Sequence, residues 1–149
     1  MKVTVIDYGI GNLFSVARAL ERCGAEVQLS SDSMEIEAAE RLVLPGVGAF
    51  QDGMQGLRER GLVEAIRKHA ASNRPLLGIC LGMQMLATVS EEFGTHEGLG
   101  LIEEAHVRRL VPEVGERERR PHEDDGARRR DAGQEVAGAT RAEHRGRGA

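Results

Sequence analysis

The 149-residue chain carries 20 Lys and Arg residues against 24 Asp and Glu residues, a net charge of −4. This balance argues against a domain-wide cationic surface for nucleic acid, and the length favours one domain, or one domain and a tail. Two cysteines build no disulfide framework, and no Cys/His spacing typical of zinc is present, so neither a metal nor a cofactor is expected. No apolar run reaches the roughly 20 residues that span a bilayer. Because Met1-Lys2 leads into a strand-like segment rather than a signal peptide, no membrane contact and a cytoplasmic setting are expected.

In the first hundred residues, short aliphatic blocks alternate with stretches whose apolar residues recur at helical spacing. Helices are predicted from Leu13 to a stop at Gly24, after a cap at Asp52, and over 62–70 before Pro75. A last helix is predicted over 83–89. Strands are predicted at residues 2–6, 26–29, 41–44 and 76–79, the last of them buried.

This alternation predicts an α/β fold with a doubly wound, mainly parallel sheet. In such sheets, ligands bind where strands end and helices begin. Three glycine-containing loops, at residues 8–12, 45–48 and 78–82, each follow a predicted strand at that edge. The first loop lacks the third glycine of a dinucleotide-binding fingerprint, so dinucleotide binding is not expected.

The composition changes after Ile102. Residues 103–149 contain 11 Arg, 11 Asp or Glu, no aromatic residue and few large aliphatic residues. Such a segment has too little apolar surface to offset the entropy cost of ordering, about 1–2 kcal/mol per residue for the backbone. Residues 1–102 are therefore predicted to form the folded part, and residues 103–149 a charged, disordered tail.

The strongest chemical signal is Gly78-Ile79-Cys80-Leu81-Gly82, a nucleophile flanked by glycines between a predicted strand and a predicted helix. Small residues on both sides let strand and helix approach each other at a sharp turn. The positive end of the following helix favours the thiolate of Cys80. The amide of Leu81 is expected to supply half of an oxyanion hole. The alternative is a buried structural cysteine beside a packing glycine.

A second loop, Pro45-Gly46-Val47-Gly48, follows the strand predicted at 41–44. Acyl transfer needs a second backbone donor opposite the nucleophile, and a Gly-Val-Gly turn can direct an N–H there. The alternative is an ordinary turn that ends a strand.

Three segments together resemble one family. Asp7-Tyr8-Gly9-Ile10-Gly11-Asn12-Leu13, Leu44-Pro45-Gly46-Val47-Gly48-Ala49-Phe50 and Gly78-Ile79-Cys80-Leu81-Gly82-Met83-Gln84 are similar to the glutamine amidotransferase subunits of imidazole glycerol phosphate synthases, which are class I, triad-type glutaminases. The resemblance runs to about Ile102 and includes the block Glu97-Gly98-Leu99-Gly100-Leu101-Ile102.

The resemblance implies that Cys80 attacks the side-chain amide of glutamine and releases ammonia. It also implies that the amides of Gly46, Val47, Gly48 and Leu81 hold the oxyanion and that Gln84 helps to seat glutamine. The expected partner is a cyclase subunit, a β/α barrel that receives the ammonia in histidine biosynthesis. Asn12 is expected to lie toward this partner in a heterodimer.

The resemblance stops before the base and the acid of the triad. The family carries these in a His-Pro-Glu segment, and none of the five histidines here precedes Pro-Glu. His69 is expected to be solvated at a helix end. The fold is thus expected to be incomplete, with a C-terminal part that is frameshifted or divergent, and the chain poorly soluble by itself. Losing the base forfeits about 10²–10⁴-fold in rate.

Two other functional hypotheses remain open on the sequence. One is a non-catalytic, truncated relative that at most binds the cyclase. The other is a different cysteine hydrolase of the same architecture, in which a nearby acid activates Cys80.

Overall fold

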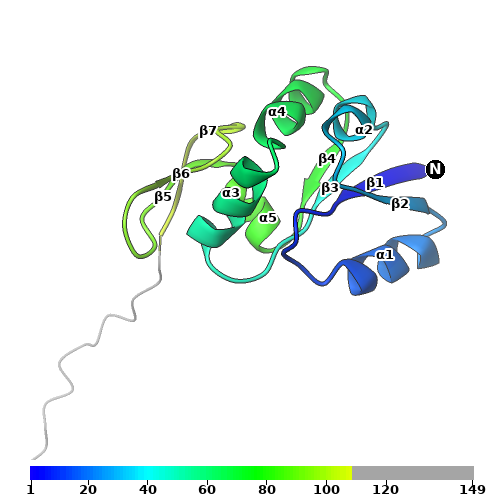
Figure 1. Ribbon diagram of the computed structural model, residues 1–149, viewed down its shortest axis with the longest axis horizontal. Coiled ribbons are helices and arrows are strands. Elements are labelled where there is room, and N and C mark those ends of the chain that lie inside the picture. The colour runs from blue at the N-terminus through cyan, green and yellow to red at the C-terminus, as the bar shows by residue number, and fades with distance from the viewer. Residues whose placement is uncertain (109–149) are drawn as a thin grey trace, which may run out of the picture. The chain divides into compact units, whose positions relative to one another are not determined.

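The computed structural model describes residues 1–108, which lie in a compact unit spanning Met1–Leu110 (Figure 1). Strands and helices alternate through most of this unit, as the sequence pattern predicts. In chain order, the elements are β1 (Lys2–Ile6), α1 (Leu13–Arg22), β2 (Glu26–Ser30), α2 (Ser33–Ala38), β3 (Leu42–Leu44), α3 (Phe50–Glu59), α4 (Val63–Ala71), β4 (Leu76–Gly78), α5 (Leu81–Met85), β5 (Ala87–Ser90), β6 (His96–Glu97) and β7 (Ile102–Val107).

The main sheet has four strands in the order β2-β1-β3-β4, and every neighbouring pair is parallel. The predicted α/β class with a mainly parallel sheet is confirmed. Val5 pairs with Leu29 on one side and with Val43 on the other, and Leu44 pairs with Gly78. Because the strands run in one direction, β1, β3 and β4 end at the same edge of the sheet, where the three glycine-containing loops begin.

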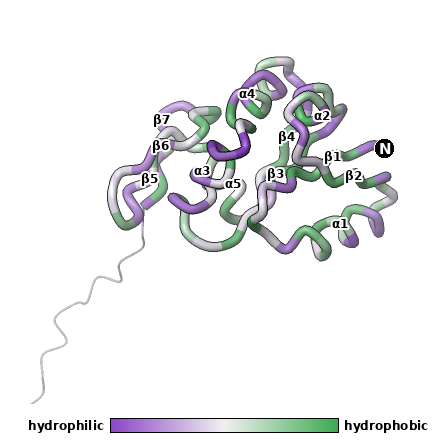
Figure 2. The backbone as a smooth tube through the Cα atoms, viewed as in Figure 1, coloured by the Kyte–Doolittle hydropathy of each residue, from purple (hydrophilic) through white to green (hydrophobic). Residues whose placement is uncertain are grey.

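Helices cover both faces of this sheet. The side chains of Val3, Val5 and Val43 form an apolar cluster with residues of α1. On the opposite face, Ile6, Leu42 and Leu44 join a larger cluster with residues of α2, α3, α4 and α5. Figure 1 shows α1 alone on one side of the strands and the other helices on the other, and Figure 2 shows the hydrophobic residues of the strands between them.

The chain leaves the main sheet after α5 and forms a second, three-stranded sheet in the order β6-β5-β7. The helix predicted over 83–89 is therefore wrong beyond Met85. β5 pairs antiparallel with β6 and parallel with β7, and Val89 lies opposite both Glu97 and His106. Thr88 and Val89 are β-branched and therefore favour a helix only weakly. The backbone hydrogen bonds of β5 to β6 and β7 override this local helical pattern.

Three further expectations need correction. β4 is not buried: it is an edge strand of the described sheet, and Leu77 is 51% exposed. Asp52 does not cap α3, because Ala49 is the N-cap and Asp52 lies within the first turn. Residues 103–107, assigned to the tail by their composition, belong to β7. The remainder of the predicted tail, residues 109–149, lies outside the described part of the chain.

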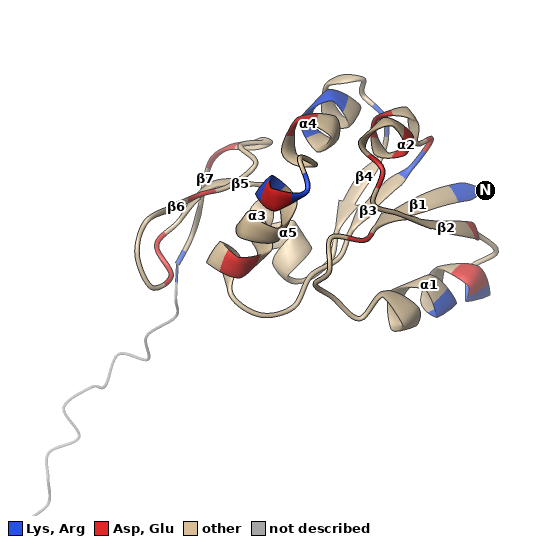
Figure 3. Cartoon of the chain, viewed as in Figure 1, with Lys and Arg blue, Asp and Glu red and all other residues tan. Residues whose placement is uncertain are grey.

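Charged residues occur in most of the helices and in β6 and β7 of the small sheet, whereas β3 and β4 contain none (Figure 3). Among the helices of residues 1–108, none is long and apolar enough to cross a membrane.

Candidate active site

Cys80 lies at a sharp turn between β4 and α5. Its backbone has φ 55° and ψ −117°, a left-handed conformation that costs a non-glycine residue on the order of 1–3 kcal/mol. Its side chain is exposed to solvent. A strained backbone that presents a reactive side chain at the end of a strand is the arrangement of a nucleophile elbow. The alternative of a buried structural cysteine does not fit this exposure.

Two glycines allow this turn to close. A Cβ on Gly78 would lie 2.5 Å from the Cα of Met83, so only a glycine lets β4 run this close to α5. A Cβ on Gly82 would overlap the carbonyl oxygen of Leu44 at the end of β3. The same oxygen accepts a hydrogen bond of 2.9 Å from the amide of Ile79. The elbow is thus attached to β3 on both sides of Cys80.

The turn at 45–48 lies against this elbow. A Cβ on Gly46 would lie 2.9 Å from the Cβ of Leu81 and 3.0 Å from the amide nitrogen of Gly82. Gly46 is buried, whereas Val47 is 51% exposed and Gly48, with φ 94°, has open space around it. The turn is therefore fixed at Gly46 and reaches solvent at the next two residues.

Tyr8, two residues after the end of β1, contacts the 45–48 turn. Its side chain is fully buried, and its hydroxyl donates a 2.8 Å hydrogen bond to the carbonyl oxygen of Pro45. A Cβ on Gly46 would lie 2.6 Å from this hydroxyl, and one on Gly56 of α3 would lie 3.1 Å from the ring. Burial raises the pKa of the phenol to about 12. Tyr8 therefore remains a hydrogen-bond donor at neutral pH.

The opening loop, residues 8–12, contacts the same turn. A Cβ on Gly11 would lie 3.7 Å from the amide nitrogen of Gly46 and 3.7 Å from the Pro45 ring. Asn12 follows as the N-cap of α1, where its side-chain oxygen accepts a 3.2 Å hydrogen bond from the amide of Ser15. All three glycine-containing loops therefore lie at one edge of the sheet.

Among the predicted site residues, the structure brings Gly46 against Leu81, the residue after Cys80. Val47 and Gly48 follow Gly46 along the turn. Gln84 is half-buried in α5, and its backbone N–H donates a 3.2 Å hydrogen bond to the backbone carbonyl oxygen of Cys80. Asn12 belongs to the start of α1 instead. Sequence reasoning assigned no role to Tyr8, because the carbonyl that it binds lies 37 residues away in the chain.

The described histidines do not complete a triad with Cys80. Within residues 1–108, no hydrogen bond joins a histidine to the thiol of Cys80. His69 is fully buried near the end of α4, contrary to the expectation of a solvated ring, and its Nε2 lies 3.1 Å from the carbonyl oxygen of Pro75, at the opposite end of β4 from Cys80. Burial lowers the pKa of His69, the Pro75 hydrogen bond opposes this effect, and the charge of Arg74 adds to it.

No metal centre is present among the residues that the structure describes, since no three His, Cys, Asp or Glu side chains there form a suitable group.

Comparison with known proteins agrees with this architecture. A family model, glutamine amidotransferase class-I, matches residues 4–146. A crystal structure of a glutamine amidotransferase superposes with a TM-score of 0.61 at 26% sequence identity, covering 71% of this chain and 56% of that one.

Curated relatives match two thirds or more of this chain. Subunit HisH 1 of imidazole glycerol phosphate synthase from Legionella pneumophila (strain Lens) is 59% identical over 100 residues, 67% of this chain and 47% of that protein. Subunit HisH from Geobacillus kaustophilus is 50% identical over 121 residues, 80% of this chain and 57% of that protein. The chain spans about half the length of the curated relatives that it matches.

Proposed function

The chain belongs to the class-I glutamine amidotransferase family, and from this premise we propose that it is a glutaminase subunit of an imidazole glycerol phosphate synthase. The observation that carries the proposal is the exposed Cys80 on a strained elbow, beside the glycine turn at 45–48. The 50–59% identity with HisH subunits supports the narrower assignment.

In the proposed reaction, the Cys80 sulfur attacks the side-chain carbonyl carbon of glutamine. The carbon–nitrogen bond breaks, ammonia leaves with the thiol proton, and a glutamyl thioester remains on Cys80. Water then hydrolyses the thioester to glutamate and regenerates the thiol. Amides of Gly46, Val47, Gly48 and Leu81 stabilise the oxyanion formed in each step, and Gln84 seats the substrate.

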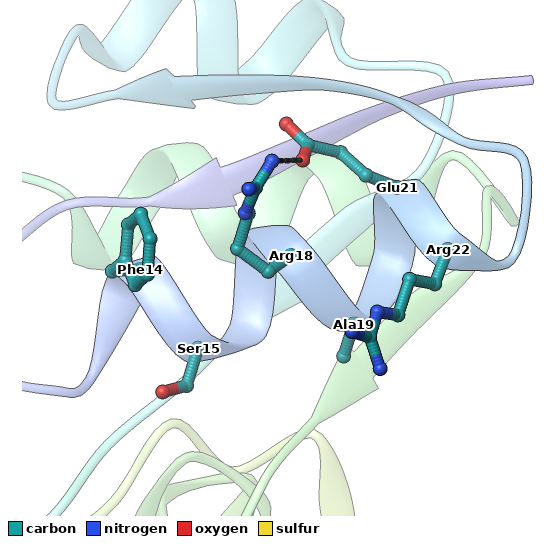
Figure 4. A pocket seen from close by; sticks show the side chains of 6 residues that line it. All are labelled: Phe14, Ser15, Arg18, Ala19, Glu21 and Arg22. Carbon is teal, nitrogen blue, oxygen red and sulfur yellow. Dashed lines mark hydrogen bonds and ion pairs between the residues drawn. The ribbon is translucent and has the colours of Figure 1, made fainter.

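We further propose that the ammonia passes to a cyclase subunit, a β/α barrel, in the histidine pathway. The surface of α1 that follows Asn12 supports a partner at this edge, because it presents Phe14, 72% exposed, beside Arg18. Figure 4 shows the residues that line a pocket on this helix, with Arg18 paired to Glu21. We place the reaction in the cytoplasm, where thiols such as Cys80 remain reduced.

The test is the release of glutamate from glutamine, measured with the cyclase subunit present. We expect slow release that Cys80→Ala abolishes and that Cys23→Ala leaves unchanged, since Cys23 is exposed at the end of α1. The rate should lie about 10²–10⁴-fold below that of a relative with a complete triad, because no histidine of this chain precedes Pro-Glu. Release equal to buffer would overturn the assignment and leave a non-catalytic relative.

A further inference from the structure

One buried side chain near the site has no part in the reaction described above. Tyr8 lies in the loop after β1, outside the 45–48 turn and the Cys80 elbow that carry the proposed chemistry, and it is fully buried. Its hydroxyl binds the carbonyl oxygen of Pro45, the residue before the glycine turn. A buried hydroxyl needs a partner, and this carbonyl satisfies it.

The hydrogen bond acts on a single peptide plane. The Pro45–Gly46 peptide is trans, so its carbonyl oxygen and the N–H of Gly46 point in opposite directions. Since Tyr8 holds the oxygen on the core side, the N–H of Gly46 points away from the core. The close approach of Gly46 to Leu81 and Gly82 then fixes this plane against the elbow.

The ring of Tyr8 is itself held in place. Gly56 of α3 lies against it so closely that a Cβ there would be 3.1 Å from the ring. Nearby on α3, a Cβ on Gly53 would be 3.0 Å from the side chain of Leu81. One helix therefore supports both the tyrosine under the turn and the first residue after Cys80.

We infer that Tyr8 is a positioning residue: its hydroxyl holds the Pro45–Gly46 peptide so that the amides of the 45–48 turn face the Cys80 thiol. This inference rests on the proposed function. Tyr8 makes no contact with substrate in this role. The effect of Tyr8 is confined to steps in which a carbonyl oxygen occupies the oxyanion site.

The experiment compares two reagents for Cys80 in the full chain and in Tyr8→Phe. The first is a glutamine analogue with a diazoketone in place of the side-chain amide. The thiol gives its proton to the diazo carbon, the sulfur–carbon bond forms, N₂ leaves, and the ketone oxygen occupies the oxyanion site. The second is iodoacetamide, which alkylates the thiol with loss of iodide and does not need that site.

For Tyr8→Phe, we expect the rate with the diazoketone to fall about tenfold, the effect of losing one well-placed hydrogen bond. The rate with iodoacetamide should stay within about twofold, since exposure of the thiol does not depend on the phenol. Equal diazoketone rates in both proteins would overturn the inference, and so would equal slowing by both reagents, which indicates a merely structural role. A parent chain that reacts no faster with the analogue than with a diazoketone lacking the amino-acid group would overturn the proposed function itself.

A second measurement avoids any loss of folding in the variant. Tyr8 is the single tyrosine of the chain, so growth on 3-fluorotyrosine labels this residue alone. We expect its fluorine resonance to shift when the diazoketone modifies Cys80 and to stay in place after iodoacetamide. A resonance that responds identically to both reagents would overturn the inference.

Discussion

Gly82 lies against the carbonyl oxygen of Leu44 so closely that a methyl group on Gly82 would overlap this oxygen. The contact joins the first turn of α5 to the end of β3 and sets how near the Cys80 elbow lies to the 45–48 turn. Because the neighbour is backbone, which cannot rotate away as a side chain can, little relaxation is available.

Gly82→Ala should therefore lower the free energy of unfolding by about 2–3 kcal/mol, a large share of the roughly 5–15 kcal/mol typical of domains. Urea unfolding monitored by circular dichroism measures this change. Met83→Ala is the matched control one residue on, where the side chain is 57% exposed, and it should change stability by less than about 0.5 kcal/mol. Equal losses in the two variants would contradict the close packing described.

Tyr8 should ionise late in the folded chain, because burial raises its pKa from 10.0 to about 12. The folded state favours the protonated phenol, so this contribution to stability is complete below pH 10 and is lost as the pH rises toward 12. Phenolate absorbance, recorded immediately after a pH jump, reports Tyr8 alone. We expect a midpoint near 12 in the folded chain and near 10 in urea. Coinciding midpoints would show that the phenol is not buried.

At acidic pH, the stability of the folded chain depends on His69. Since burial lowers its pKa, the unfolded chain takes up a proton first as the pH falls below about 6.5, and the folded state loses stability there. His69→Gln keeps a donor for the Pro75 carbonyl and removes the titration. We expect its unfolding free energy to fall less steeply between about pH 7 and 5 than that of the parent. A slope equal to that of the parent would refute the assignment.

We expect the half-exposed Leu77 to make β4 a site for self-association. It lies on an edge strand of the described sheet, where unpaired backbone groups and an apolar side chain favour pairing between chains. Leu77→Lys should raise the concentration at which light scattering first increases. Met34→Lys, on α2 and 77% exposed, should have little effect. If both variants behave alike, general charge and not the strand edge controls solubility.

Much of the main sheet follows from local sequence. Three of its strands, β1, β3 and β4, are rich in aliphatic residues, and β2 alternates Val27 and Leu29 with polar residues. The predicted bounds of all four strands are confirmed to within one residue. α2 was not predicted, because its six residues carry no clear apolar period. Its cap, Asp32, accepts hydrogen bonds from the amides of Met34 and Glu35. That signal was present in the sequence but weak.

The parts that local patterns miss depend on distant contacts. β5 is a strand because β6 and β7 supply its partners. His69 is buried because its ring meets Pro75, whose position depends on the turn after α4. At the site, the glycine-containing motifs at 8–12, 45–48 and 78–82 predicted that three loops lie at one edge of the sheet. The link from Tyr8 to Pro45 needed the fold, since strand order is not readable from spacing.

The proposed function requires that Cys80 is the residue that reacts with glutamine. Peptide mapping by mass spectrometry, after limited exposure to the diazoketone analogue of glutamine, tests this directly. We expect the modification on Cys80, protected by added glutamine, with Cys23 unmodified although it is also exposed. Modification of Cys23 to the same extent, or of Cys80 without protection by glutamine, would contradict the account.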